Sequence, residues 1–192
     1  MKRGHLFILS GPAGAGKGTL RKILFRETGD LVYSISCTTR KMRPGEAEGR
    51  DYHYISRGEF EKMADRGEFL EWAEVHRNCY GTRKNDVERV LNEGRDMVLE
   101  IDVKGCRQIK DIVPDAIRIF ITVPSLDELE NRLEERGTET SEQMGVRLRN
   151  AAAEMKQAAE YDHVIVNDDI MRASKELGEI IKSYRKTGRQ CK

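Results

Sequence analysis

A run of glycines around one lysine is the part of this sequence whose residue types most clearly suggest chemistry. The segment GPAGAGKGT, residues 11–19, follows the apolar stretch LFILS and leads into the helix-like stretch KGTLRKILFRET. Glycines let successive backbone N–H groups curl around an anion without Cβ collisions, and a following helix points its positive end at the same anion. The spacing Gly11-x4-Gly16-Lys17 therefore predicts a phosphate-binding loop in which Lys17 reaches the β- and γ-phosphates of a nucleotide.

The residue after Lys17 departs from the common form of this loop, which has Ser or Thr there to bind Mg²⁺ through its hydroxyl. Here Gly18 occupies that position, and the hydroxyl comes one residue later, at Thr19. The GKGT segment resembles the loop of adenylate kinases and related nucleoside monophosphate kinases. The resemblance implies that Mg²⁺ is held mostly by phosphate oxygens and water, with no direct protein ligand. It favours phosphoryl transfer to a small molecule over a motor or GTPase function.

A second group of polar residues follows between residues 36 and 82. Arg40 and Arg43 lie three residues apart, ahead of a Pro-Gly turn, and Tyr52 and Tyr80 come later. Guanidinium and phenol groups suit a phosphate dianion. The carboxylate of Glu71 suits a pair of N–H donors. Each of these residues, taken alone, could simply be an exposed surface residue. Their occurrence together suggests a second binding site.

The elements that must position these residues alternate between strand and helix. Near-continuous apolar strands with helices between them favour a parallel sheet that is covered on both faces. Two predicted helices, residues 125–136 and 174–184, each open on a serine that could act as an N-cap. The five predicted core strands are HLFILS, LVYSIS, MVLEIDV, IRIFITV and HVIVND.

Two segments break this alternation. Residues 38–96 include RDYHYIS and FLEWAEV, whose alternating pattern predicts a small mixed sheet with one exposed face. Residues 126–156 are highly charged, with ERGTETSE between two helices, and predict a mobile helical cover. We expect a single domain whose core comprises residues 1–37, 97–125 and 157–192.

Composition narrows the function classes further. The 192 residues suit one domain with a substantial core. With 34 basic and 33 acidic side chains, the net charge of +1 gives no general attraction to nucleic acid or to an anionic membrane. No apolar run approaches the roughly 20 residues that span a bilayer. The four cysteines form no CxxC pair, which predicts free thiols in a cytoplasmic protein. The sequence does not indicate an oligomeric state.

Seven segments occur in the order found in guanylate kinases, and this resemblance covers nearly the whole chain. It implies an α/β, three-layer P-loop kinase fold with a parallel core sheet, a small mixed-β GMP-binding subdomain at residues 38–96 and a helical lid at residues 126–156. It also implies the reaction ATP + GMP ⇌ ADP + GDP with Mg²⁺, so that the partners are small-molecule nucleotides. The segments are GPAGAGKGT, SISCTTRKMRPGE, GRDYHYI, FLEWAEVHRNCYGT, LEIDVKG, RLEERGTET and VIVND.

The resemblance also implies roles for individual residues. Glu100 and Asp102 match an acidic strand end beside the site, where they contact GMP or order the water shell of the metal. Lys17 and the three lid arginines match groups that act on the transferring phosphates, namely Lys17, Arg132, Arg136 and Arg147. The ATP-binding positions are Gly11, Pro12, Ala13, Gly14, Ala15, Gly16, Lys17, Gly18 and Thr19, with Asn167 near the adenine. The guanine is held by Ser36, Glu71 and Thr82, and the GMP phosphate by Arg40, Arg43, Tyr52 and Tyr80.

Besides Gly18, two departures from the family pattern are visible. Ala13 stands where the family often has Ser, and Arg77 replaces the usual glycine of an HGN turn. Two alternative functions stay open at this point. One is a non-catalytic guanylate-kinase-like domain that binds phosphopeptides, against which the intact Lys17 and lid arginines argue. The other is a kinase for another acceptor, such as AMP or a sugar phosphate, against which Glu71 and the TTR segment argue.

Overall fold

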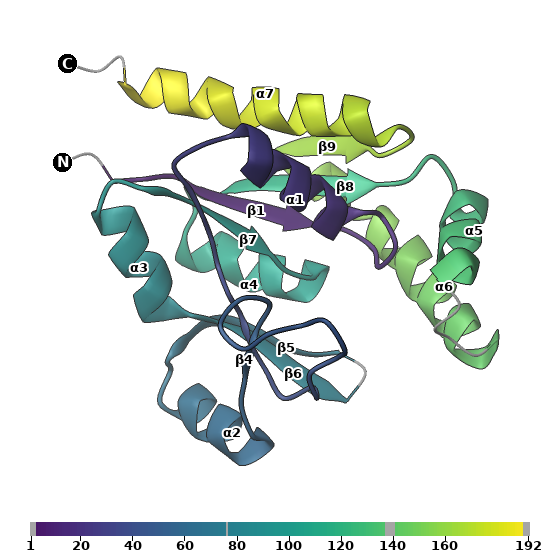
Figure 1. Ribbon diagram of the computed structural model, residues 1–192, viewed down its shortest axis with the longest axis horizontal. Coiled ribbons are helices and arrows are strands. Elements are labelled where there is room, and N and C mark those ends of the chain that lie inside the picture. Colours follow the sequence, from purple (N-terminus) through teal and green to yellow (C-terminus); the bar gives the residue numbers. More distant parts are fainter. Residues whose placement is uncertain (1–2, 76, 137–140, 190–192) are drawn as a thin grey trace. The chain divides into compact units, whose positions relative to one another are not determined.

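The computed structural model describes residues 3–75, 77–136 and 141–189 (Figure 1). Strands and helices alternate along most of this length, as the sequence predicts. The strands are β1 (Leu6–Ser10), β2 (Leu31–Tyr33), β3 (Cys37–Thr38), β4 (His53–Tyr54), β5 (Phe69–Val75), β6 (Asn78–Arg83), β7 (Asp96–Glu100), β8 (Ile117–Thr122) and β9 (His163–Val166). The helices are α1 (Lys17–Glu27), α2 (Arg57–Asp65), α3 (Lys84–Asn92), α4 (Val103–Ile112), α5 (Leu126–Arg136), α6 (Ser141–Met155) and α7 (Ile170–Arg189).

The chain forms two compact units. Unit 1 comprises Met1–Leu6, Val32–Leu99 and Lys104–Ala116, and unit 2 comprises Phe7–Leu31, Glu100–Val103 and Ile117–Lys192. Each unit is therefore assembled from segments that are far apart in the sequence. The predicted bounds of the subdomain (residues 38–96) and the lid (residues 126–156) are drawn from the order of elements along the chain, and they differ from the bounds of these two units. They remain predictions.

The larger sheet has the strand order β2-β7-β1-β8-β9. Within unit 2, β8 pairs in parallel with β1 on one side and with β9 on the other. All five residues of β1 are buried. This confirms the predicted α/β fold with a parallel core sheet.

Two helices of unit 2 contribute apolar stripes to its core. Helix α1 buries Leu20 and Leu24, and α7 buries Ala173, Leu177 and Ile181. The spacing of four residues places each set on one face of its helix. Helices α1 and α7 pack against each other. The helix that follows the glycine loop is therefore held in place by α7.

A separate four-stranded sheet in unit 1 has the order β4-β3-β6-β5. Strands β3 and β4 are parallel, whereas β6 is antiparallel to both β3 and β5, so the sheet is mixed as predicted. Its apolar face packs on α2 through Phe60 and Met63, which lie in one cluster with Cys37 and Cys79. The Phe60 and Phe69 rings stack at 4.4 Å between centroids.

The two serine caps have different outcomes. Ser125 caps α5 as predicted, since its Oγ accepts a hydrogen bond from the Glu128 backbone N–H at 3.1 Å. The prediction for Ser174 is wrong, because α7 begins four residues earlier, at Ile170. The carboxylate of Asp169 caps that helix, with its Oδ1 2.7 Å from the backbone N of Arg172.

Two further predictions concern membrane contact and thiols. None of the helices in the described part of the chain has the length and apolar character needed to span a bilayer. Cys37, Cys79 and Cys106 are free thiols and are buried. Cys191 lies outside the described residues.

Candidate active site

The glycine loop, residues 11–19, adopts a backbone that requires glycine. Gly11, Gly14 and Gly16 have φ angles of 135°, 95° and 89°, a region that L side chains rarely adopt. Space is also lacking: a Cβ on Gly11 would lie 2.0 Å from the carbonyl O of Ile121, and one on Gly16 would lie 2.4 Å from Asn167 Nδ2. The loop can therefore curl tightly between β1 and α1 only with these residues.

Lys17 and the start of α1 together form a positive environment at this loop. The Lys17 Nζ donates hydrogen bonds to the carbonyl oxygens of Gly11 at 2.6 Å and Pro12 at 3.0 Å, so its side chain folds back along the loop. Helix α1 begins after Gly16 with no side-chain cap and no acidic residue in its first turn. Its first backbone N–H groups and its dipole thus favour an anion.

Asn167 supports the loop from the end of β9. Its side chain is buried, and Nδ2 donates to the carbonyl O of Ala15 at 2.7 Å. The carbonyl O of Asn167 accepts a hydrogen bond from Arg132 Nη2 at 2.9 Å, and Arg132 Nε also donates to Glu128 at 2.8 Å. Arg132 of α5 is therefore tied to the residue that holds the loop. The contact of Asn167 with adenine remains a prediction.

The acidic side chain of Glu100, in unit 2, lies beside the first turn of α1. Glu100 ends β7, and its Oε2 accepts a hydrogen bond from Arg21 Nε at 3.0 Å. A Cβ on Gly18 would lie 3.6 Å from Glu100 Oε1, so this carboxylate lies beside the position where other loops carry the metal-binding hydroxyl. Asp102 is partly buried. Within the described residues, no group of three or more His, Cys, Asp or Glu side chains could hold a metal ion.

The other two lid arginines are less closely defined than Arg132. Arg147 lies in α6 and is partly buried. Arg136 is the last residue of α5, and its side chain lies outside the described part of the chain.

In unit 1, Glu71 and Thr82 form a buried polar pair. They are cross-strand neighbours in β5 and β6, and Thr82 Oγ1 donates to Glu71 Oε1 at 2.6 Å. Glu71 is 4% exposed and Thr82 is 0% exposed. The hydroxyl fixes one carboxylate oxygen, which orients Glu71. Ser36 lies one residue before β3 and is partly buried, and its carbonyl O accepts a hydrogen bond from the backbone N of His53 at 2.9 Å.

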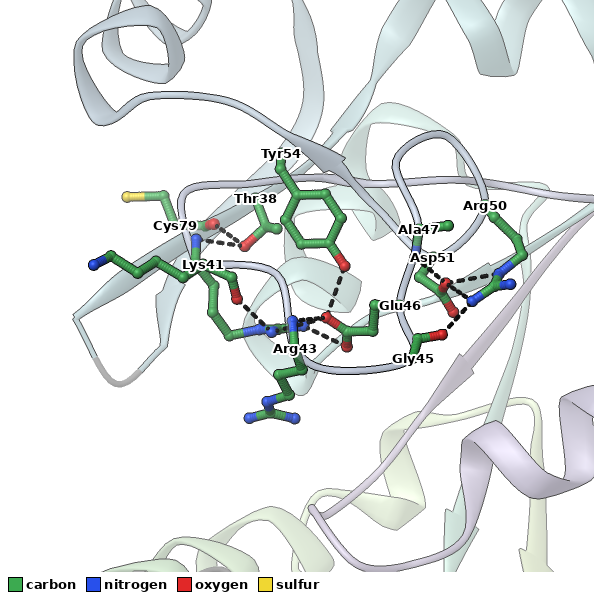
Figure 2. A network of polar contacts seen from close by, with 11 residues as sticks. Thr38, Lys41, Arg43, Gly45, Glu46, Ala47, Arg50, Asp51, Tyr54 and Cys79 are labelled. Atoms are coloured by element: carbon green, nitrogen blue, oxygen red, sulfur yellow. Dashed lines mark hydrogen bonds and ion pairs between the residues drawn. The ribbon is translucent and has the colours of Figure 1, made fainter.

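Arg40 belongs to a network around Glu46 (Figure 2). The Arg40 guanidinium binds both carboxylate oxygens of Glu46, from Nη2 to Oε1 at 2.8 Å and from Nη1 to Oε2 at 3.1 Å. Glu46 also accepts hydrogen bonds from the backbone N of Arg43 at 2.8 Å and from the Tyr54 hydroxyl at 2.7 Å. The hydrogen bond from Arg40 is the main cause that lowers the pKa of Glu46 to about 2. Burial, with Glu46 as second cause, raises the pKa of Tyr54 to about 12.

Two aromatic rings lie close to the Arg40 guanidinium. Its Cζ lies 5.4 Å from the ring centroid of Tyr52 and 6.0 Å from that of Tyr54. The Tyr52 ring in turn packs edge-on against Tyr80, with 5.8 Å between centroids. Three of the four residues predicted to hold the GMP phosphate are thus neighbours. The fourth, Arg43, is exposed, and Figure 2 shows its guanidinium pointing away from Glu46.

Sequence reasoning missed Glu46 and Tyr54. The signals were present: Glu46 follows the Pro-Gly turn three residues after Arg43, and Tyr54 lies two residues after Tyr52 in an alternating segment. A period of two places Tyr52 and Tyr54 on the same face of the chain. The residues that the sequence assigned to ATP lie in unit 2, as do Glu100 and Asp102 of the GMP set. Those assigned to guanine and to the GMP phosphate lie in unit 1.

The fold and the loop geometry define a P-loop kinase of the small-molecule type. The family model for guanylate kinase matches residues 3–184, and the chain belongs to the guanylate kinase family. It is 50% identical over 182 residues to a guanylate kinase of Oceanobacillus iheyensis, covering 95% of this chain and 88% of that protein. A guanylate kinase of Rubrobacter xylanophilus is 44% identical over 191 residues, with both chains covered completely.

A solved structure shows the same similarity. The crystal structure of guanylate kinase from Anaplasma phagocytophilum superposes with a TM-score of 0.78 and 32% identity, and it covers 96% of this chain and 87% of that one. The recognition made from the motifs is confirmed. The protein is an ATP:GMP phosphotransferase that forms ADP and GDP.

Proposed function

We propose that the two nucleotides of this reaction bind to different units of the chain. The glycine loop of unit 2 binds the phosphates of ATP through its backbone N–H groups, the start of α1 and Lys17. The polar residues of unit 1 bind GMP. The observation that carries this assignment is the buried Thr82–Glu71 pair, since it presents a carboxylate that is both buried and oriented.

Glu71 is the residue that we assign to the recognition of guanine. Guanine presents two adjacent donors, its N1–H and its 2-amino group, and one carboxylate can accept both. Adenine has an acceptor at N1 and no 2-amino group, so its lone pair would meet a negative charge. A site built to pair polar groups rejects analogues that lack them far better than an apolar pocket does. Ser36 and Thr82 complete this part of the site.

The GMP phosphate is assigned to Arg40, Arg43, Tyr52 and Tyr80. A phosphate dianion offers several acceptor oxygens to guanidinium and phenol donors, and charge-assisted bonds of this kind are about twice as strong as neutral ones. On GMP binding, Arg43 can turn its guanidinium toward the phosphate. That rotation is within reach of an exposed, long side chain.

The metal requirement follows from the donor groups around Gly18. A hydroxyl ligand is absent at that position, and Glu100 lies beside it, which suits Mg²⁺ held by phosphate oxygens and water with Glu100 and Asp102 ordering that water. Mg²⁺ bound with ATP supplies neutralisation of the phosphate charge. Lys17, Arg132, Arg136 and Arg147 add positive charge around the phosphoryl group that moves. The acceptor phosphate is already nucleophilic, so we assign no general base.

The substitution Glu71→Gln tests the guanine assignment. Gln keeps the shape but offers one acceptor and one donor, so one guanine N–H loses its partner. A lost charge-assisted bond and a buried donor without an acceptor cost about 2–4 kcal/mol. We expect kcat/KM for GMP to fall about 30- to 1,000-fold with the KM for ATP little changed. Discrimination against AMP should shrink as well.

Glu74→Gln serves as the matched control. Glu74 lies on the same strand, but its side chain is exposed and paired with Arg57. It should keep GMP turnover close to the parent value. If Glu71→Gln also stays within about threefold of the parent in kcat/KM, which is under 1 kcal/mol, Glu71 does not read guanine.

A further inference from the structure

Glu46 is held by four hydrogen bonds within unit 1. It accepts two bonds from Arg40, one from the backbone N of Arg43 and one from Tyr54. Both carboxylate oxygens are engaged, since three of these bonds reach Oε2 and one reaches Oε1. A side chain held in this way cannot rotate without breaking several bonds at once.

The arrangement divides the guanidinium of Arg40 into two parts. A guanidinium carries five N–H groups in a planar fork geometry. The end-on pair, one N–H each from Nη1 and Nη2, binds Glu46, and the second Nη1–H donates to the carbonyl O of Lys41 at 2.8 Å. The Nε–H and the outer Nη2–H, which form the parallel side-on pair, take part in neither of these bonds, and the Tyr80 side chain, itself assigned to the phosphate, also interacts with this guanidinium.

The plane of this guanidinium is also fixed. The Tyr52 and Tyr54 rings, which pack edge-on against each other at 5.9 Å between centroids, both lie against it, and the Arg40 side chain is 12% exposed. Tyr54 contributes twice, because its ring lies against Arg40 and its hydroxyl donates to Glu46. Donors that are oriented before binding lose less entropy when a ligand arrives.

We propose that Glu46 is a positioning residue that occupies the end-on pair of Arg40 N–H groups so that the side-on pair is presented to the phosphate of the acceptor nucleotide. Two phosphate oxygens match two parallel N–H groups in a bidentate contact. The proposal rests on the assignment of Arg40 to the GMP phosphate made above. It adds a residue that does not touch the phosphate but determines the direction from which Arg40 does.

The opposite expectation follows if Glu46 acts through charge alone. A carboxylate that neutralises Arg40 weakens the attraction of that guanidinium for a dianion. Removal of the charge would then tighten phosphate binding. Orientation and charge therefore predict changes of opposite sign, which makes a single substitution informative.

The test is Glu46→Gln, studied by calorimetric titration of the full-length protein with GMP and, separately, with guanosine. Gln places an amide N–H against an Arg40 N–H and disrupts the end-on contact. We expect GMP affinity to fall about tenfold or more, a typical cost for one charge-assisted bond. Guanosine lacks the phosphate, and its affinity should stay within about twofold of the parent. Turnover at saturating GMP should change less than the KM for GMP.

Glu48→Gln is the matched control for loop folding. Glu48 also accepts two hydrogen bonds in the same segment, from the His53 ring and the Tyr54 backbone, but none from Arg40. The two substitutions change the charge equally. GMP affinity of Glu48→Gln close to the parent supports the proposal. Equal weakening in both variants, or GMP binding by Glu46→Gln that is unchanged or tighter, overturns it.

A measurement on the parent protein tests the same proposal without a variant, in case Glu46→Gln does not fold. The ¹⁵N resonance of Arg40 Nε should shift on addition of GMP but not of guanosine, since only GMP carries the phosphate. An Nε resonance that GMP leaves unchanged, in a protein that binds GMP more tightly than guanosine, overturns the proposal. If the parent binds the two equally, the phosphate assignment itself fails, and that outcome is distinct from a failure of Glu46 alone.

Discussion

Arg77 has a backbone φ of 64°, in the left-handed region where a Cβ is strained. It precedes β6 in a hairpin whose last pair is Val75 and Asn78. The resemblance to guanylate kinases implies glycine at this position. Arg77 therefore replaces a glycine at a position whose backbone conformation favours glycine.

Arg77→Gly should therefore stabilise the protein. Relief of the left-handed strain, less the entropy that glycine loses on folding, amounts to about 0.5–1 kcal/mol. For a chain of this size the melting temperature should rise by about 1–4 °C. Arg66→Gly is the control, since Arg66 has a φ of −81° that any residue adopts, and glycine there should destabilise. A lower melting temperature for Arg77→Gly than for the parent would contradict the strain argument.

Cys37 gives a prediction that depends on pH. Burial raises the pKa of its thiol from 9.0 to about 11. The thiolate is the reactive form, and at pH 8 it makes up about 0.1% of such a thiol. Iodoacetamide at pH 8 should therefore modify the peptide that contains Cys37 far more slowly in the native protein than in denaturant, as followed by mass spectrometry. Rapid native modification would show that the thiol is neither buried nor protonated.

The same pKa shift links folding to pH. The folded state holds the thiol proton more tightly than the unfolded state, so this contribution is fully present below pH 9 and is lost as pH rises toward 11. The melting temperature of the parent should fall more steeply between pH 9 and 11 than that of Cys37→Ala. Parallel slopes for the two proteins would remove Cys37 as the cause.

At the level of elements, the start of α7 shows which of two possible residues caps the helix. Both Asp169 and Ser174 are residue types that cap helices. The helix begins at Ile170, so Ser174 falls inside it, where its hydroxyl is buried and has no hydrogen-bond partner among the described residues. The sequence pattern that placed the helix start at Ser174 overlooked IMRA, whose residues continue the helical face toward the N-terminus.

The two residues should respond differently to alanine. Asp169→Ala removes the N-cap and should cost about 1 kcal/mol of unfolding free energy, measured by urea denaturation. Ser174→Ala removes a buried hydroxyl that lacks a partner and should be neutral or slightly stabilising. If Ser174→Ala destabilises more than Asp169→Ala, the helix starts at the later residue after all.

The core elements could be predicted because each carries its own signal. The strand β1 is apolar throughout, and the Gly11, Gly16 and Lys17 spacing identifies the loop after it without any tertiary information. The Thr82–Glu71 contact depends on the register of the β5–β6 hairpin, which the residue types alone do not determine. Strands β3 and β4 have two residues each, too few for a period to show.

The Glu46 network could not be predicted for a different reason. Its bonds depend on how the turn between Arg43 and Glu46 directs the carboxylate, and residue types alone do not determine that direction. Asn167 is similar, because its role in holding Ala15 arises from a contact across 152 positions of the chain. Patterns predict the elements, whereas side-chain directions come from the assembled fold.

On the scale of the whole molecule, the residues that we propose for the two nucleotides belong to different units. The glycine loop belongs to unit 2, and Arg40 and Glu71 belong to unit 1. Direct transfer requires the reacting phosphate atoms to come within about 3–3.5 Å in line. It also requires water to be excluded, because water would otherwise accept the phosphoryl group. A protein that binds its substrates on separate bodies can meet both requirements by closing only when both substrates are bound.

We therefore expect the distance between the units to shorten when GMP and a non-hydrolysable ATP analogue are both present, and to shorten less with either one alone. Spin labels at Glu61→Cys in unit 1 and Met171→Cys in unit 2 would report this distance by pulsed electron resonance, since both positions are exposed. The three described native thiols are buried, and Cys191 would be replaced by Ala beforehand. A second pair within unit 2, Glu27→Cys with Met171→Cys, should keep a constant distance and serves as the control. An unchanged distance between the units in the doubly liganded protein would show that the transfer occurs without domain closure.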